Sequence, residues 1–267
     1  MPENCAPETG FVSLRHIDKT FNPGSASEVA LFSDFSFEAG HRQFVSVIGG
    51  NGSGKTTLLN LICGSVTADS GEVFLGGRDI GRQKEHERSK VIGRVFQDPA
   101  KGTCPTLTIL ENMSLADHKG ASYGLSPGVS RGRVDYYRAQ LELLDLGLED
   151  KIHLRADALS GGQRQALALL IAAMAPLELL ILDEHTAALD PRSSETVMEL
   201  TDRIVQQKNL TTVMVTHNLK HAAAYGGRLV MLHRGVVAFD VSGEEKATLT
   251  AKELAERFSE VTFEHPN

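Results

Sequence analysis

One glycine-rich stretch decides the fold of this chain, and it reads Gly49-Gly50-Asn51-Gly52-Ser53-Gly54-Lys55-Thr56-Thr57. The mostly apolar residues 44–48 before it predict a strand, and residues 56–63 after it predict a helix. Glycines let the backbone N–H groups of such a loop point inward around the β- and γ-phosphates of a nucleotide. Lys55 adds a positive charge for the phosphate oxygens, and the Thr56 hydroxyl can ligate Mg²⁺. The strand–loop–helix context therefore predicts a nucleotide-binding α/β domain.

Two adjacent carboxylates follow a second apolar segment. Residues 179–182 are Leu-Leu-Ile-Leu, a continuous run that is typical of a strand buried on both faces. The run delivers Asp183 and Glu184 to the carboxyl end of the strand, where α/β sheets bind ligands. We expect Asp183 to hold Mg²⁺ through water and Glu184 to act as general base toward the attacking water. The alternative is a pair of surface carboxylates that begin a loop.

A second glycine motif lies between these two features and reads Leu159-Ser160-Gly161-Gly162-Gln163. Ser160 is a good N-cap for a helix predicted over residues 164–174, and the following N–H groups form an anion site. Alone, the motif would be a capped helix after a glycine turn. In this order, the three motifs together resemble the nucleotide-binding subunit of an ABC transporter. The resemblance implies that Ser160, Gly161, Gly162 and Gln163 contact the ATP of a second copy in a head-to-tail dimer.

Four further residues match lesser motifs of the same family. Gln97, in a Val-Phe-Gln-Asp-Pro segment, matches the Q-loop, which senses Mg²⁺ and water. His217 matches the switch histidine that contacts the γ-phosphate, although a lone His there is more often a structural residue. Asp190 matches the D-loop that links the two sites of the dimer. Phe21 occupies the position of an aromatic that stacks on adenine, and its alternative is an ordinary core residue.

The resemblance implies a P-loop NTPase (RecA-like) core with an antiparallel β subdomain and an inserted α-helical subdomain. We expect residues 1–267 to form a single ABC ATPase domain. Its expected parts are a core with the β subdomain over 11–97 and 177–241, a helical subdomain over 98–176, and a short C-terminal extension over 242–267.

Apolar patterns predict the remaining elements. Further strands are expected at 11–14, 72–75, 91–96 and 211–215, with a hairpin at 228–232 and 236–241. Further helices are expected at 107–115, 134–146, 193–207 and 250–258. Glycines and a proline mark residues 118–133 as a loop or mobile segment.

Composition narrows the class of protein. The chain has 267 residues, of which 41% are hydrophobic and 23% charged, as in an ordinary folded domain. A net charge of −7 argues against nucleic acid as a partner. Cys5, Cys63 and Cys104 form neither a metal spacing nor a disulfide framework. The N-terminus lacks a signal-peptide pattern, and the apolar stretch 166–182 is too short and interrupted for a membrane span.

Three positions depart from the common family pattern. Gly50 and His185 stand where proline is common, and Ile171 replaces a frequent arginine. None of these changes removes a catalytic group, so we expect ATPase activity. The segments 184–190 and 216–221 look like those of ATPases encoded beside a periplasmic-type binding protein and one permease. Some of that group are thought to import aromatic or other hydrophobic amino acids.

The resemblance therefore implies the ATPase subunit of a bacterial importer, with ATP and Mg²⁺ as cofactors. It would lie peripherally at the cytoplasmic face of the cell membrane, dock a permease through residues 97–113, and work indirectly with a substrate-binding protein. The same motifs also power exporters and lipid-extraction complexes. Another alternative is a non-transport clamp on DNA, a ribosome or a division complex. A GTPase is disfavoured because no Asn-Lys-x-Asp run is present.

Overall fold

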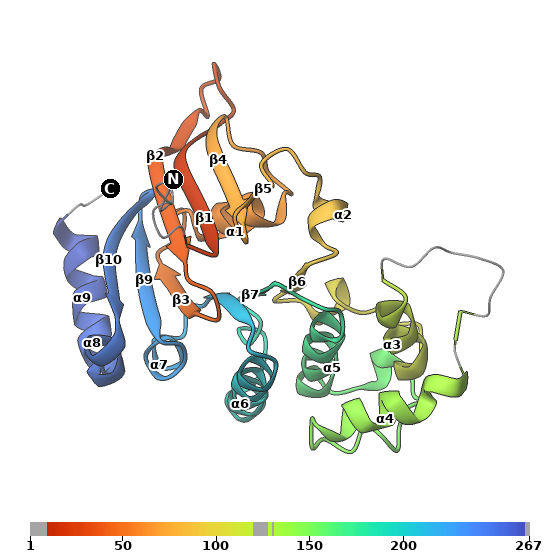
Figure 1. Ribbon diagram of the computed structural model, residues 1–267. Coiled ribbons are helices and arrows are strands. Elements are labelled where there is room, and N and C mark those ends of the chain that lie inside the picture. The colour runs from red at the N-terminus through yellow and green to blue at the C-terminus, as the bar shows by residue number, and fades with distance from the viewer. Residues whose placement is uncertain (1–9, 120–127, 130, 265–267) are drawn as a thin grey trace, which may run out of the picture. The chain divides into compact units, whose positions relative to one another are not determined.

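The computed structural model describes residues 10–119, 128–129 and 131–264 (Figure 1). The chain forms two compact units, one built from residues up to 89 and from 211 onward, the other from residues 90–210. The loop expected at 118–133 falls mostly outside the described residues. The subdomain boundaries expected from the sequence stay predictions.

The first unit contains an antiparallel sheet with the strand order β2-β1-β4-β5. Its strands are β1 (Val12–Phe21), β2 (Val29–Ala39), β4 (Ser70–Leu75) and β5 (Arg78–Asp79). Alternate side chains such as Phe35 and Phe37 are buried, as expected when one sheet face covers a core. The sequence pattern did not predict β2. The register against β1 shifts where Asp34 adopts a left-handed φ of 55°, so the period-two pattern is broken there.

The strand that leads into the glycine loop belongs to a mostly parallel set in the same unit. These strands are β3 (Phe44–Gly49), β8 (Thr211–Val215), β9 (Arg228–His233) and β10 (Val236–Ser242). Strand β3 pairs in parallel with both β8 and β9, and β10 closes the predicted hairpin against β9. All six residues of β3 and all five of β8 are buried, including the polar Ser46, Thr211 and Thr212, as expected of parallel strands that are covered on both faces.

The same unit also contains helices. The helix after the glycine loop is α1 (Lys55–Cys63), and α2 (Glu85–Arg88) ends the N-terminal segment of this unit. At the other end of the chain, α7 (Leu219–Ala224), α8 (Gly243–Thr248) and α9 (Ala251–Glu264) lie beside β9 and β10 (Figure 1, blue). The final helix is longer than the predicted 250–258, because Leu254, Phe258 and Val261 form one apolar face that packs on β9 and α7.

The second unit carries one parallel strand pair and a group of helices. Its elements are β6 (Ile92–Val95), β7 (Leu179–Asp183), α3 (Ile109–Asp117), α4 (Val134–Glu142), α5 (Gly161–Met174) and α6 (Pro191–Lys208). Short 3₁₀ turns lie at Pro99–Lys101, Arg131–Arg133 and Ala156–Ala158. Helix α5 contacts α3, α4 and α6, and its residues 165–170 are all buried. Its apolar stretch is therefore a core helix.

The boundaries of α4 and α5 also differ from the sequence prediction. Helix α4 ends at Glu142 rather than at residue 146, because Asp145 adopts a left-handed φ of 53° and the chain turns there. Helix α5 begins three residues earlier than predicted, because the Ser160 cap starts the helix at Gly161. No helix among the described residues is long and apolar enough to cross a membrane.

Candidate functional site

The glycine loop folds around the ammonium group of Lys55. Lys55 is 5% exposed, and its Nζ donates hydrogen bonds of 2.8 Å to the carbonyl oxygens of both Gly49 and Gly50. Ser53 donates its backbone N–H to Gly50 at 3.3 Å, which closes the turn. The Ser53 hydroxyl is buried without a hydrogen-bond partner among the described residues. The loop thus holds a cation and spare polar hydrogens at one place, an arrangement suited to an anionic ligand.

Two glycines of this loop are required by close packing. A Cβ on Gly49 would lie 2.3 Å from the carbonyl oxygen of Leu232 on β9. A Cβ on Gly54, whose φ is 107°, would lie 2.7 Å from the ring of Phe32 on β2. Side chains at either position would push the loop away from the strands that support it. The glycines therefore fix the position of the loop as well as its backbone freedom.

The other loop residues lie at the surface or near it. Asn51, Gly52 and Thr56 are exposed, and Thr57 is half-buried at the start of α1. The first turn of α1 contains no acidic residue, so its N-terminus keeps the positive end of the helix dipole unopposed.

His217 follows the carboxyl end of the strand next to the loop. Val215 of β8 pairs with Val47 of β3, so His217 and Gly49 each lie two residues beyond a paired position. The register therefore brings both to the same edge of the parallel strands. His217 is exposed, and Asn218 next to it caps α7 by accepting N–H groups from that helix.

Phe21 lies at the end of β1 and is half-buried. The Lys19 ammonium lies 5.5 Å from the centroid of its ring and forms a 2.7 Å ion pair with Asp69. An aromatic face that is partly exposed remains available for stacking. Its contact with adenine stays a prediction.

The predicted carboxylates lie at the end of β7 in the second unit. Asp183 accepts a 2.6 Å hydrogen bond from Arg94 of β6. Glu184 is half-buried and has a left-handed φ of 49°, and its carbonyl accepts the N–H of Ala187 in the following turn. Such a conformation is uncommon for a residue with a side chain and recurs at functional sites.

The Q-loop glutamine lies at the same edge as these carboxylates. Val95 of β6 pairs in parallel with Leu182 of β7. Gln97 and Glu184 each lie two residues beyond that pair, so the register brings both past the carboxyl ends of neighbouring strands. Gln97 is exposed. The register of the second unit therefore places the backbone of Gln97 and of Glu184 at one edge of this strand pair, and the catalytic roles of both residues stay predictions.

The second glycine motif forms the first turn of α5. Ser160 is the N-cap, its hydroxyl accepts from the N–H of Gln163 at 3.2 Å, and the Gln163 side chain accepts from the N–H of Ser160. This reciprocal pair is a capping box, which leaves Ser160 and Gly161 exposed at the positive end of the helix. The predicted capped helix is confirmed.

The D-loop aspartate caps the neighbouring helix. Asp190 accepts N–H groups of Arg192 and Ser193 at the start of α6, and hydrogen bonds from Ser193 hold the pKa of Asp190 below its ordinary value. A Cβ on Gly162 would lie 3.0 Å from the Ser193 side chain. The signature turn and the start of α6 are therefore in close contact.

Comparisons with known proteins agree with this arrangement of motifs. A family model described as ABC transporter matches residues 32–187. The chain belongs to the ABC transporter family. It is an ATP-binding cassette and an ATPase of the P-loop NTPase fold.

Individual relatives align with most of the length of this cassette. It is 44% identical to a tyrosine transport ATP-binding protein of Clostridioides difficile over 93% of this chain and 98% of the relative. It is 31% identical to a phosphonates import ATP-binding protein of Oceanobacillus iheyensis over 86% of this chain and 89% of the relative. A solved ATP-binding cassette in a dimeric post-hydrolysis state with ADP and Pi matches with a TM-score of 0.72 and 27% identity, over 86% of this chain and 98% of the other.

Each unit by itself offers oxygen donors that fit Mg²⁺ arriving with a nucleotide. Thr56, Gln97 and Asp183 offer hydroxyl, amide and carboxylate oxygens, the ligand type that Mg²⁺ prefers. Among the described residues, no group of three or more His, Cys, Asp and Glu side chains could hold a metal by itself. Mg²⁺ in nucleotide enzymes characteristically takes one or two side chains together with substrate phosphates, so such a group is not needed.

Arg88 supports the glycine-loop helix and was not found by sequence reasoning. Its side chain is buried and donates to the carbonyls of Leu61 and Ile62 at the end of α1, at 2.7 and 2.9 Å. It also donates to the carbonyls of Gln83 and Gly81. Burial lowers the pKa of Arg88 from its ordinary value. The acceptors on α1 lie 27 and 26 residues before Arg88, so no local pattern marks its contact with that helix.

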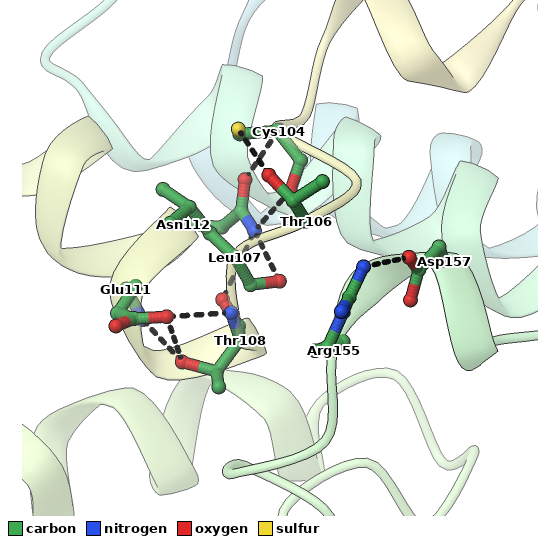
Figure 2. Close-up of polar contacts among 8 residues, drawn as sticks. All are labelled: Cys104, Thr106, Leu107, Thr108, Glu111, Asn112, Arg155 and Asp157. Carbon is green, nitrogen blue, oxygen red and sulfur yellow. Dashed lines mark hydrogen bonds and ion pairs between the residues drawn. The ribbon is translucent and has the colours of Figure 1, made fainter.

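Asn112 organises the segment that follows the Q-loop (Figure 2). Its side-chain oxygen accepts the N–H of Cys104 at 2.6 Å. Its amide group donates to the carbonyls of Cys104, Leu107 and Thr108 at 3.0, 3.2 and 2.9 Å. One buried side chain from α3 therefore fixes the preceding turn, and α3 itself begins with a Thr108–Glu111 capping box.

Proposed function

We propose that this cassette is the ATP-hydrolysing subunit of an importer for an amino acid or a similar small solute. The observation that carries the proposal is the 44% identity to a tyrosine transport ATP-binding protein over 98% of that protein. Relatives named for phosphonate import give further support for import over export. An aromatic amino acid is the substrate that we propose first.

The glycine loop is proposed to bind the β- and γ-phosphates of ATP through its N–H groups, with Lys55 supplying positive charge. Phe21 would stack on adenine. The buried ammonium of Lys55, already surrounded by loop carbonyls, supports this role because it is held at the loop. Thr56 and Asp183 would hold Mg²⁺, the latter through water, and Gln97 would contact the metal and the attacking water. The metal would neutralise charge on the phosphates.

Glu184 is proposed as the general base that accepts a proton from the attacking water, and His217 as a contact to the γ-phosphate. The left-handed backbone of Glu184 and the half-buried position of its side chain support a fixed carboxylate there. Water attack on the γ-phosphorus releases ADP and phosphate while the proton passes to the Glu184 carboxylate.

The catalytic unit is proposed to be a head-to-tail dimer of two copies. Ser160, Gly161, Gly162 and Gln163 would contact the ATP that is bound by the partner, and Asp190 would link the two sites. The dimeric state of a solved cassette with ADP and Pi supports this arrangement. Exposure of the α5 N-terminus supports it too, because Gly161 is exposed and its N–H is not used by the capping box.

An integral-membrane permease is the proposed partner at residues 97–113, with a substrate-binding protein acting indirectly. The cassette would then lie at the cytoplasmic face of the cell membrane. Gln97 of the Q-loop is exposed, and the turn that follows it is held by hydrogen bonds from Asn112. Both observations support a docking role.

Recovery of the complex from native membranes tests the importer proposal. We expect the tagged cassette, extracted in mild detergent, to bring down a multi-span permease and a substrate-binding protein. The purified binding protein should then bind tyrosine or another aromatic amino acid in a calorimetric titration. A tagged unrelated ATPase from the same cells is the control. Recovery with ribosomes, DNA or division proteins alone would contradict the transport role.

A further inference from the structure

Arg94 makes a direct contact with the carboxylate that is proposed to hold Mg²⁺. Its Nη2 lies 2.6 Å from Oδ2 of Asp183, and the two side chains are only 13% and 18% exposed. The distance is that of a strong charge-assisted hydrogen bond. Because one oxygen of Asp183 is engaged by Arg94, the orientation of the whole carboxylate group is set.

The strand register explains how the two residues meet. Arg94 of β6 pairs with Ile181 of β7 in a parallel ladder. Side chains alternate along strands, so Arg94 projects from the same face as Ile181 and as Asp183, two residues further on. The side chain of Arg94 therefore has to reach only toward the carboxyl end of the next strand.

The guanidinium of Arg94 is itself held in place. Its Cζ lies 4.8 Å from the centroid of the Phe96 ring, a cation–π distance. The carbonyl of Phe96 accepts a 2.9 Å hydrogen bond from Gln165, a fully buried residue of the signature helix α5. Arg94 is thus restricted by Asp183 on one side and by Phe96 on the other. Phe96 is the residue just before Gln97.

We propose that Arg94 is a positioning residue for the metal carboxylate. It holds Oδ2 of Asp183, so Oδ1 would be the oxygen that serves the water shell of Mg²⁺. Carboxylates that serve metals are commonly oriented by such outer partners, and removal of these partners lowers metal affinity about 10- to 100-fold. This inference rests on the proposed role of Asp183.

A purely structural ion pair is the competing explanation. Breaking such a pair would lower the stability of the fold. It would leave the affinity for the metal unchanged. A second competitor is electrostatic, because the charge of Arg94 would repel a nearby cation and its removal would tighten metal binding. The three explanations predict different changes in metal affinity.

The test measures Mn²⁺ binding in the presence of saturating ADP, with free Mn²⁺ followed by electron paramagnetic resonance. We expect Arg94→Met to raise the Mn²⁺ dissociation constant about tenfold. The affinity for ADP in EDTA should stay unchanged. Arg94→Lys keeps the charge without the planar fork, so it should also weaken Mn²⁺ binding. Arg228→Met is the control, because it breaks another Arg–Asp pair, with Asp240 at 2.6 Å in the other unit.

Asp183→Asn separates failure of the inference from failure of the proposed function. If Asp183→Asn weakens Mn²⁺ binding and Arg94→Met leaves it within about twofold of wild type, the role of Arg94 is wrong. Tighter binding by Arg94→Met would also overturn it, in favour of repulsion. If Asp183→Asn itself has no effect, the proposed metal role of Asp183 fails. Circular dichroism at 222 nm checks that each variant is folded.

Discussion

The imidazole of His185 is buried, and its Nε2 lies 3.0 Å from the hydroxyl of Thr201 on α6. Thr201 donates its own hydroxyl hydrogen to the carbonyl of Val197 at 2.7 Å. The hydroxyl must therefore accept from His185, which places a proton on Nε2. This contact ties the residue after Glu184 to a long helix, and it occupies a position where the family commonly has proline.

Loss of the Thr201 hydroxyl should destabilise the second unit. Thr201→Val keeps the shape of the side chain but removes the acceptor for a buried N–H, which costs about 1–3 kcal/mol. Urea unfolding followed by circular dichroism measures the change. Thr201→Ser retains the hydroxyl and should lose less. Equal losses for Val and Ser would show that packing, not the hydrogen bond, is responsible.

Arg88→Met should reduce the free energy of unfolding by about 3 kcal/mol, since several buried carbonyls lose a charged donor. The chain contains no tryptophan, so the unfolding is best followed by circular dichroism. ATP affinity should fall as well, because α1 continues directly from the glycine loop. Arg82→Met, an exposed change in the same segment, is the control. A wild-type unfolding curve for Arg88→Met would contradict the bracing role.

Glu184→Gln should abolish turnover while ATP binding persists, since an amide cannot accept the proton of the attacking water. The loss expected for a general base is about 10²- to 10⁴-fold. Phosphate release measures the rate, and size-exclusion chromatography with ATP should reveal a trapped dimer. Glu199→Gln on the exposed face of α6 is the matched control. A rate within about twofold of wild type would remove Glu184 from this role.

Acid should destabilise the first unit through Asp69. Lys19 and the N–H of Thr20 donate to this carboxylate and hold the pKa of Asp69 below its ordinary value of about 3.9. The folded pKa is the lower one, so the stabilisation is complete above the unfolded pKa and disappears as the pH falls through the folded pKa.

The difference in unfolding free energy between pH 7 and pH 3 should therefore be smaller for Asp69→Asn than for the wild-type chain. Urea titrations at both pH values measure it. Asp135→Asn is the control, because this exposed carboxylate has no hydrogen bond among the described residues. An unchanged difference for Asp69→Asn would show that its contacts do not persist in solution.

Asn112→Ala should loosen the turn that follows the Q-loop. The N–H of Cys104 loses its acceptor, so its hydrogen exchange should become faster, and the stability should fall by about 2 kcal/mol. Less permease should then be recovered with the cassette. Thr106→Ala, an exposed change in the same turn, should have neither effect. Normal permease recovery with Asn112→Ala would place the docking surface elsewhere.

The sequence alone determined the elements whose signals are local. A glycine loop between a strand and a helix, the Ser160 cap and the apolar run before Asp183 all depend on neighbouring residues, and each was predicted correctly as a strand, loop or helix. Hydrogen bonding within a turn and burial of a continuous strand act over a few residues, so they leave a readable pattern.

Only the tertiary structure decided the contacts between distant residues. Arg94 and Asp183 are 89 residues apart, and Arg88 lies 27 residues after its acceptor Leu61. Strand register and helix packing create these contacts, and neither has a local signature in the side chains involved. The same reason explains β2, whose alternation is broken by the bulge at Asp34. The sequence shows which functional groups are present. The tertiary structure determines which distant residues contact those groups and hold them in position.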